Sequence, residues 1–239
     1  MRKYLLIVMT ALILGFAVPN LNADTTYNMV TGFSHTSNPN GVWTYEYDGT
    51  PFTGAQGFSN VVAGLPGWWN GGTQPDSRAI LQNVTGGAVV YSTVTDPNNT
   101  LYLDPQGGTV AVLFTAPSAG AYTIAGNFVG IDMVGNSHPV SILDDGTVVF
   151  SGTIATYGAT DSFNLSETLK AGDTISFDVG TGSGGSCSYC FLGTGLDGTV
   201  TEASTTAAPE PGTVGLTLLG LGLVLIMRKR FAQRVQQAV

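Results

Sequence analysis

Residues 139–150 read Pro-Val-Ser-Ile-Leu-Asp-Asp-Gly-Thr-Val-Val-Phe. Two apolar runs, 139–143 and 147–150, flank Asp144-Asp145-Gly146. An Asp-Gly pair between such runs is typical of a tight hairpin, because the turn needs positive φ angles that glycine adopts without strain. This stretch therefore predicts two antiparallel strands that are joined by a short turn.

Alternation of apolar and polar residues predicts the other strands. In residues 42–47 it places Trp43, Tyr45 and Tyr47 on one face. Further strands are predicted at 88–94, 110–114, 122–128, 162–165, 174–179 and 195–201. No segment between residues 24 and 208 keeps a helical period for three turns. We therefore expect an all-β fold, a β-sandwich or jelly roll, over residues 24–201.

Charge is distributed unevenly along the chain. Six of the eight basic residues lie in residues 1–23 and 228–239, which leaves Arg78 and Lys170 against all 16 acidic residues between Asp24 and Glu210. The resulting net charge of −14 repels nucleic acid and other polyanions, so no nucleic-acid partner is expected. It is compatible with neutral polysaccharides and divalent cations, and equally with a soluble surface that binds nothing.

Residues 1–23 have the pattern of a secretory signal peptide. Arg2-Lys3 forms a basic start, residues 4–16 are apolar and uncharged, and Ala23 is a small residue at the expected cleavage site. The mature chain would then begin at Asp24. An uncleaved membrane anchor is the alternative.

The C-terminal region contains the same kinds of segment in the opposite order, with an apolar run that precedes a basic cluster. A small, polar linker at 202–208 precedes Pro209-Glu210-Pro211, an apolar run at 213–227 and the basic cluster Arg228-Lys229-Arg230. As a helix, this run would be about 24 Å long, barely enough to cross a bilayer. The basic cluster would stay in the cytoplasm and leave the preceding domain outside.

Residues 209–239, with Pro209-Glu210-Pro211, the short apolar helix and the basic end, resemble the PEP-CTERM sorting domain. The resemblance implies an exported protein that contacts the inner membrane in transit and then reaches the cell surface or extracellular matrix. It implies an exosortase as partner, which recognises and cleaves the tail. Two features depart from the family pattern, namely Gly212 after the second proline and the extra residues 231–239.

The middle of the chain resembles a jelly-roll, galactose-binding-like domain of exported bacterial proteins. The matching stretches are Phe33-Ser34 and residues 38–43, 114–117, 120–123, 169–173 and 194–197. The resemblance implies a fold that often binds carbohydrate, sometimes with a structural calcium. Asp197 lies in the matching last strand and is the predicted calcium ligand, since calcium prefers hard oxygen ligands. No other cofactor is expected.

Trp68, Trp69 and Asn70 are candidate sugar-binding residues. They lie in Pro-Gly-Trp-Trp-Asn-Gly-Gly, residues 66–72, a loop by composition. Two adjacent side chains cannot both face a sheet core from one strand, so one ring is expected outside the core. Such a ring could stack on the face of a sugar. The alternative is that the ring only packs the loop against the edge of the sandwich and binds no ligand.

Cys187 and Cys190 are the two cysteines of the chain. Zinc would need two further ligands, and a redox motif would need a following helix that the sequence does not predict. Outside the cell we expect a disulfide between them, with free thiols as the alternative.

The sequence carries little catalytic chemistry. His35 and His138 lie far apart beside turn residues, and no Gly-x-Ser-x-Gly motif occurs. Glu46 and Asp48 share a face of one strand and offer the nearest approach to the paired carboxylates of a glycoside hydrolase. We therefore expect a non-catalytic surface protein that adheres to polysaccharide. The alternatives are a purely structural protein and a secreted hydrolase.

Overall fold

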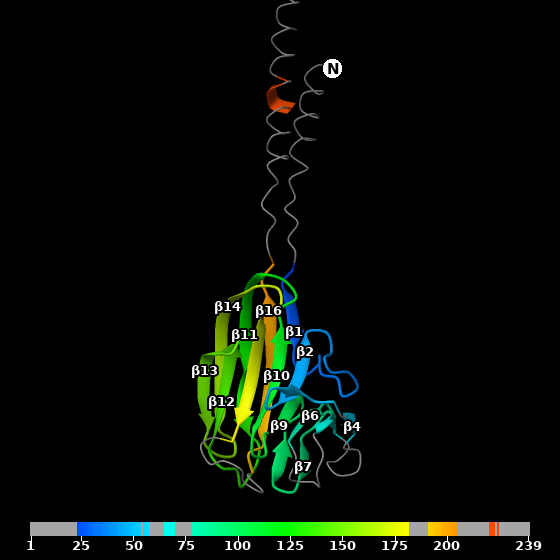
Figure 1. The fold of residues 1–239 in the computed structure, drawn as a ribbon, viewed down its shortest axis with the longest axis vertical. Helices are drawn as coiled ribbons and strands as arrows, with labels where there is room; N and C mark the ends of the chain where they lie inside the picture. Colours follow the sequence, from blue (N-terminus) through cyan, green and yellow to red (C-terminus); the bar gives the residue numbers. More distant parts are fainter. Residues whose placement is uncertain are drawn as a thin grey trace, which may run out of the picture. The chain divides into compact units, whose positions relative to one another are not determined.

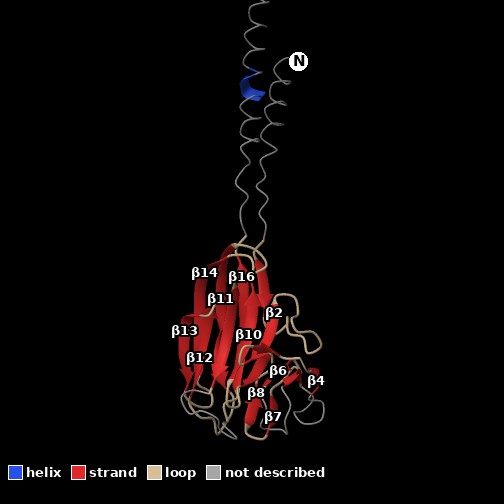
Figure 2. Cartoon of the chain, in the orientation of Figure 1, coloured by secondary structure: helices blue, strands red, loops and turns tan. Residues whose placement is uncertain are grey.

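The computed structural model describes residues 23–53, 55–57, 65–69, 78–181, 191–204, 220–222 and 224. The chain divides into two units, 24–203 and the two terminal segments together. The larger unit is built from two antiparallel sheets, which confirms the all-β sandwich prediction (Figures 1 and 2).

In the second unit, the described part of the tail is a helical turn at 220–222 and 224, and the predicted signal peptide lies outside the described residues except for Ala23. Within the described residues, no helix has the length and apolar character needed to cross a membrane.

One sheet has eight strands. In spatial order these are β14 (Thr160–Leu169), β11 (Gly120–Gly130), β16 (Thr194–Glu202), β9 (Thr100–Asp104), β6 (Ala79–Asn83), β5 (Pro66–Trp69) and β4 (Ala55–Gly57), and β1 (Thr25–Asn28) also pairs with β16. The other sheet has six strands. Their order is β13 (Thr147–Ile154), β12 (His138–Asp144), β15 (Thr174–Gly180), β10 (Thr109–Thr115), β2 (Trp43–Tyr47) and β3 (Thr50–Pro51). A separate pair is formed by β7 (Val89–Tyr91) and β8 (Val94–Asp96).

The hydrophobic core lies between the two large sheets. The predicted aromatic stripe of β2 faces it, with Trp43 and Tyr45 buried and Tyr47 packed against its edge. From β10, Val110, Val112 and Phe114 enter the same core, as alternation predicts for one strand face. Burial of these apolar side chains is the main favourable term for the fold.

The predicted hairpin is confirmed. β12 pairs with β13 from His138 to Asp144, and the turn residues Asp145 and Gly146 have φ angles of 44° and 80°. Positive φ at both central positions is the geometry for which Asp-Gly is suited. The turn is held further by Asp145, whose backbone N–H donates to the Thr174 carbonyl.

Two sequence predictions in the β5–β8 region are wrong. Residues 88–94 do not form one strand, because Ser92 has a φ of 49° and turns the chain back between β7 and β8. The stretch predicted as a loop at 66–72 begins as strand β5. Gly67 allows β5 to lie close to β6, since a side chain there would meet the Ile80 carbonyl.

The first and last strands of the sandwich lie side by side. Thr25, the first residue of β1, is opposite Glu202, the last residue of β16, so the chain enters and leaves the sandwich at the same end. Figure 1 shows β7 at the opposite end.

Candidate functional site

Trp68 lies in the core rather than at the surface. Its side chain is 3% exposed, its ring stacks on Tyr45 at 6.4 Å between centroids, and its Nε1 donates to the Ser34 carbonyl at 2.6 Å. A ring packed in this way cannot stack on a sugar, so the sugar-contact prediction is wrong for Trp68.

Trp69 points to the other face of β5, as the alternation of a strand requires. It is half-buried and packs against a second apolar cluster on the outer face of the eight-stranded sheet. Asn70, Cys187 and Cys190 lie outside the described residues. Sugar contact by Trp69 and Asn70 and the predicted disulfide stay predictions.

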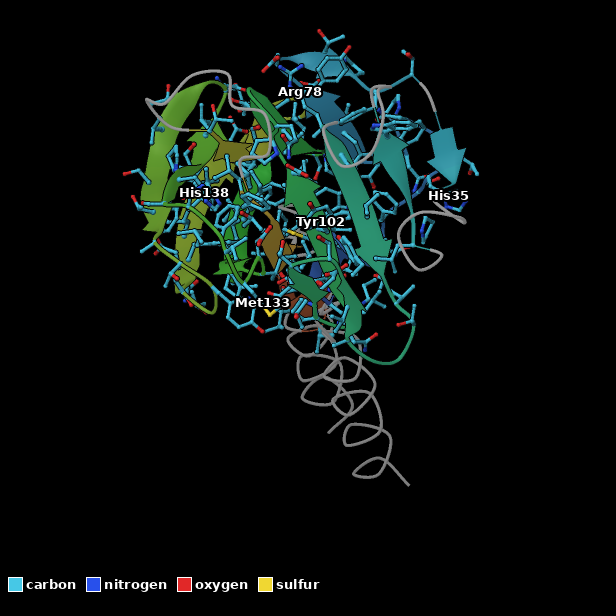
Figure 3. All side chains as sticks on the ribbon, turned by 90° about the horizontal axis from the view of Figure 1, so that it is seen from below. His35, Arg78, Tyr102, Met133 and His138 are labelled. Atoms are coloured by element: carbon cyan, nitrogen blue, oxygen red, sulfur yellow. The ribbon has the colours of Figure 1, made fainter. Side chains whose placement is uncertain are left out.

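The second apolar cluster is covered by the β7–β8 hairpin. Its buried members are Leu65, Ala79, Leu81, Val94, Tyr102 and Ile131. Tyr91 of β7 contacts Tyr102 of β9 edge-on, with ring centroids 6.1 Å apart. Figure 3 looks at the sandwich from the hairpin end and places Tyr102 near the centre of the view.

Three buried aspartates lie in this hairpin region. Asp96 is 0%, Asp104 7% and Asp132 5% exposed. Burial raises the pKa of both Asp96 and Asp104 to about 7, because a carboxylate loses its hydration there. Nothing in the sequence pattern marks these three aspartates as buried, since aspartate is normally a surface residue.

A second acidic pair lies on the solvent-facing side of the six-stranded sheet. Glu46 of β2 and Asp178 of β15 are both registered with Ala111 of β10, so the two carboxyls flank a small residue. Burial raises the pKa of both groups, and the charge of Asp178 adds to the effect on Glu46. Ser176 donates a hydrogen bond to Asp178. Glu46, Ala111 and Asp178 thus form a row across three strands that presents two carboxyl groups, and the Ser176 hydroxyl is bonded to one of them.

Asp48, which the sequence paired with Glu46, has a different role. It follows the end of β2 with a φ of 45° and forms an ion pair with Arg78 at 3.1 Å. The same Arg78 lies over the Tyr47 ring, 5.6 Å from its centroid. Arg78, one of the two basic residues between positions 24 and 203, therefore has a structural role.

Asp197, the predicted calcium ligand, is half-buried on β16. Its carboxylate accepts a hydrogen bond from the Asn127 side chain, which lies opposite on β11. Within the described residues, no three Asp, Glu, His or Cys side chains form a group that could hold a metal. Calcium at Asp197 stays a prediction.

The two histidines do not come together. His35 lies in the loop before β2, whereas His138 begins β12 and is 3% exposed. His138 Nε2 lies 2.6 Å from Thr194 Oγ1, and burial lowers its pKa. His138, which the sequence places beside turn residues, is therefore a buried strand residue at the start of β12.

Residues 207–230 match the family described as PEP-CTERM protein-sorting motif. The C-terminal segment is a PEP-CTERM sorting motif. This confirms the resemblance based on Pro209-Glu210-Pro211 and Arg228-Lys229-Arg230. The PEP-CTERM motif indicates an exported protein that is sorted to the cell surface, and it implies processing by an exosortase. No curated protein matches the chain significantly.

Solved structures resemble the sandwich at low similarity. A family 35 carbohydrate-binding module from Clostridium thermocellum is 16% identical, with 49% of this chain and 89% of that chain covered and a TM-score of 0.32. A CBM35 from Paenibacillus barcinonensis is 12% identical, with coverages of 75% and 99% and a TM-score of 0.29. A GH26-CBM35 β-(1,4)-mannanase from Podospora anserina is 11% identical, with coverages of 79% and 28% and a TM-score of 0.30. Likeness at this level assigns neither a ligand nor an activity to the chain.

Proposed function

We propose that the chain is an exosortase substrate whose β-sandwich is carried to the cell surface and separated there from its sorting tail. The observation that carries this proposal is the PEP-CTERM motif at 207–230. The last strand, β16, ends at Glu202, so every strand of the sandwich precedes the motif. Cleavage within the motif would remove no part of the sheets.

Substitution of the motif tests the proposal. Replacing Pro209, Glu210 and Pro211 together by alanine should leave an uncut form in the membrane fraction, because the enzyme loses its recognition sequence. Arg234→Ala is the matched control, since Arg234 lies beyond the matched residues. The proposal fails if the triple variant is processed and released like the wild type.

For the sandwich itself we propose non-catalytic adhesion to a neutral polysaccharide. The supporting observation is the row of Glu46 and Asp178 around Ala111 on the solvent-facing side of the six-stranded sheet. Carboxylates accept hydrogen bonds from sugar hydroxyls, and such charge-assisted bonds are stronger than neutral ones. The net charge of −14 over residues 24–210 counts against acidic polysaccharides.

Binding to a panel of neutral polysaccharides tests this second step. The double variant Glu46→Gln, Asp178→Asn should lose at least about tenfold in affinity, or about 1.4 kcal/mol. Asp24→Asn, an exposed aspartate before β1, is the control. Release of reducing sugar would favour the hydrolase alternative, and absence of any binding would favour a purely structural protein.

A further inference from the structure

The β7–β8 hairpin is a two-stranded sheet of its own that lies on the outer face of the eight-stranded sheet. Its backbone hydrogen bonds to the rest of the domain join residues 93–95 to residues 131–133. Thr95 donates to the Ile131 carbonyl, Met133 donates to the Thr93 carbonyl, and Val94 forms a bridge with Asp132. The Asn83 side chain of β6 also donates to the Asp96 carbonyl at 2.9 Å, and side-chain packing against Tyr102 and its neighbours supplies further contacts.

Two buried acids of this region, Asp96 at the end of β8 and Asp104 at the end of β9, lack full hydrogen-bond compensation. Asp96 Oδ1 accepts from Thr100 at 2.9 Å, but its Oδ2 is buried without a hydrogen-bond partner. Asp104 Oδ2 accepts from the Tyr102 hydroxyl at 2.8 Å and from the Gln106 side chain at 3.4 Å, but its Oδ1 is buried without a hydrogen-bond partner. An ionised carboxylate left in this state costs several kcal/mol unless a cation or proton neutralises it.

The surroundings supply no positive charge within the described residues. The titratable groups that face these acids are Tyr91 from β7, Tyr102 from β9 and Asp132 from the segment after β11. Arg78 is next in sequence to Ala79, the partner of Asp104, but its guanidinium pairs with Asp48. Among the residues that the structure describes, no three Asp, Glu, His or Cys side chains could hold a metal, and we take protons as the means of neutralisation.

We infer that the β7–β8 hairpin is a pH-sensitive clamp, packed on the eight-stranded sheet while its own Asp96 and the Asp104 of β9 are protonated and loosened as they ionise. Burial raises the pKa of each acid to about 7, whereas an aspartate in water has a pKa of about 4. The open state therefore releases protons first as the pH rises. The advantage of the closed state is greatest below pH 4, falls between about pH 4 and 7, and is constant above that range.

Hydrogen exchange of the full chain tests the clamp. We expect the amides of residues 89–96, corrected for the intrinsic pH dependence of exchange, to lose roughly tenfold or more in protection between pH 5 and 8. One acid with these two pKa values can change the closed-to-open ratio by up to about a thousandfold. The double variant Asp96→Asn, Asp104→Asn should show no such pH dependence, because the asparagine side chains do not ionise.

Three results would overturn the inference. The first is a wild-type hairpin whose corrected protection is the same at pH 5 and 8. The second is a double variant that keeps the wild-type profile. The third is loss of the profile in the control Asp24→Asn, which would attribute it to overall charge. The wild-type titration alone decides the matter if the double variant does not fold.

Discussion

Thr25 of β1 lies opposite Glu202 of β16, which brings the first and last strands of the sandwich together. Tyr27, two residues further along β1, contacts the core residue Phe114 with ring centroids 5.2 Å apart, and its hydroxyl donates to Glu202 at 3.3 Å. The strand pair β1 and β16 is therefore formed and packed entirely by residues that precede the sorting motif.

Removal of the tail should not affect the sandwich. A chain of residues 24–204 should unfold at the same temperature as the full chain, because no strand is lost. A chain that starts at Met29 lacks β1 and should lose about 1–3 kcal/mol, since Tyr27 no longer covers the core. Thermal and denaturant unfolding measure both. Equal destabilisation of the two chains would mean that the tail supports the fold.

Trp68 should matter for stability. Trp68→Ala should lower the free energy of unfolding by about 3–5 kcal/mol, because it leaves a cavity and the Ser34 carbonyl without its donor. Trp69→Ala, on the half-buried outer face, should cost clearly less. Urea titration of the two variants provides the comparison. A Trp68 variant as stable as the wild type would contradict the burial of this ring.

Sequence reasoning succeeded where side chains alternate or a turn has special chemistry. Trp43, Tyr45 and the Asp145-Gly146 turn are examples. It failed for β9, where all five residues are buried because the hairpin covers the outer face, so no alternation remains. The buried Asp96 and Asp104 follow from that same tertiary contact, which no local pattern encodes.

His138 should make stability depend on pH. Burial lowers the pKa of its imidazole, so the unfolded chain takes up a proton first as the pH falls below about 6.5. The wild type should therefore lose stability on acidification relative to His138→Gln, which has no imidazole. Paired unfolding curves from pH 5 to 8 separate this effect from the opposite one of the buried acids. A constant difference between the two proteins would contradict the prediction.

Calcium at Asp197 can be tested in a similar way. If the ion is bound, excess chelator should lower the melting temperature of the wild type, and Asp197→Asn should remove that response. The Asn127 side chain donates to Asp197 Oδ1, and asparagine at position 197 keeps an oxygen that can accept that hydrogen bond. An unchanged melt of the wild type in chelator would remove calcium from the account.

Processing of the segment from Pro209 onward can be read from the mature protein itself. Mass spectrometry of the protein recovered from the cell surface should show an intact sandwich that includes β16 through Glu202. It should show no peptide from Leu216 to Arg230. Recovery of the mature protein with its C-terminus intact through Val239 would contradict it.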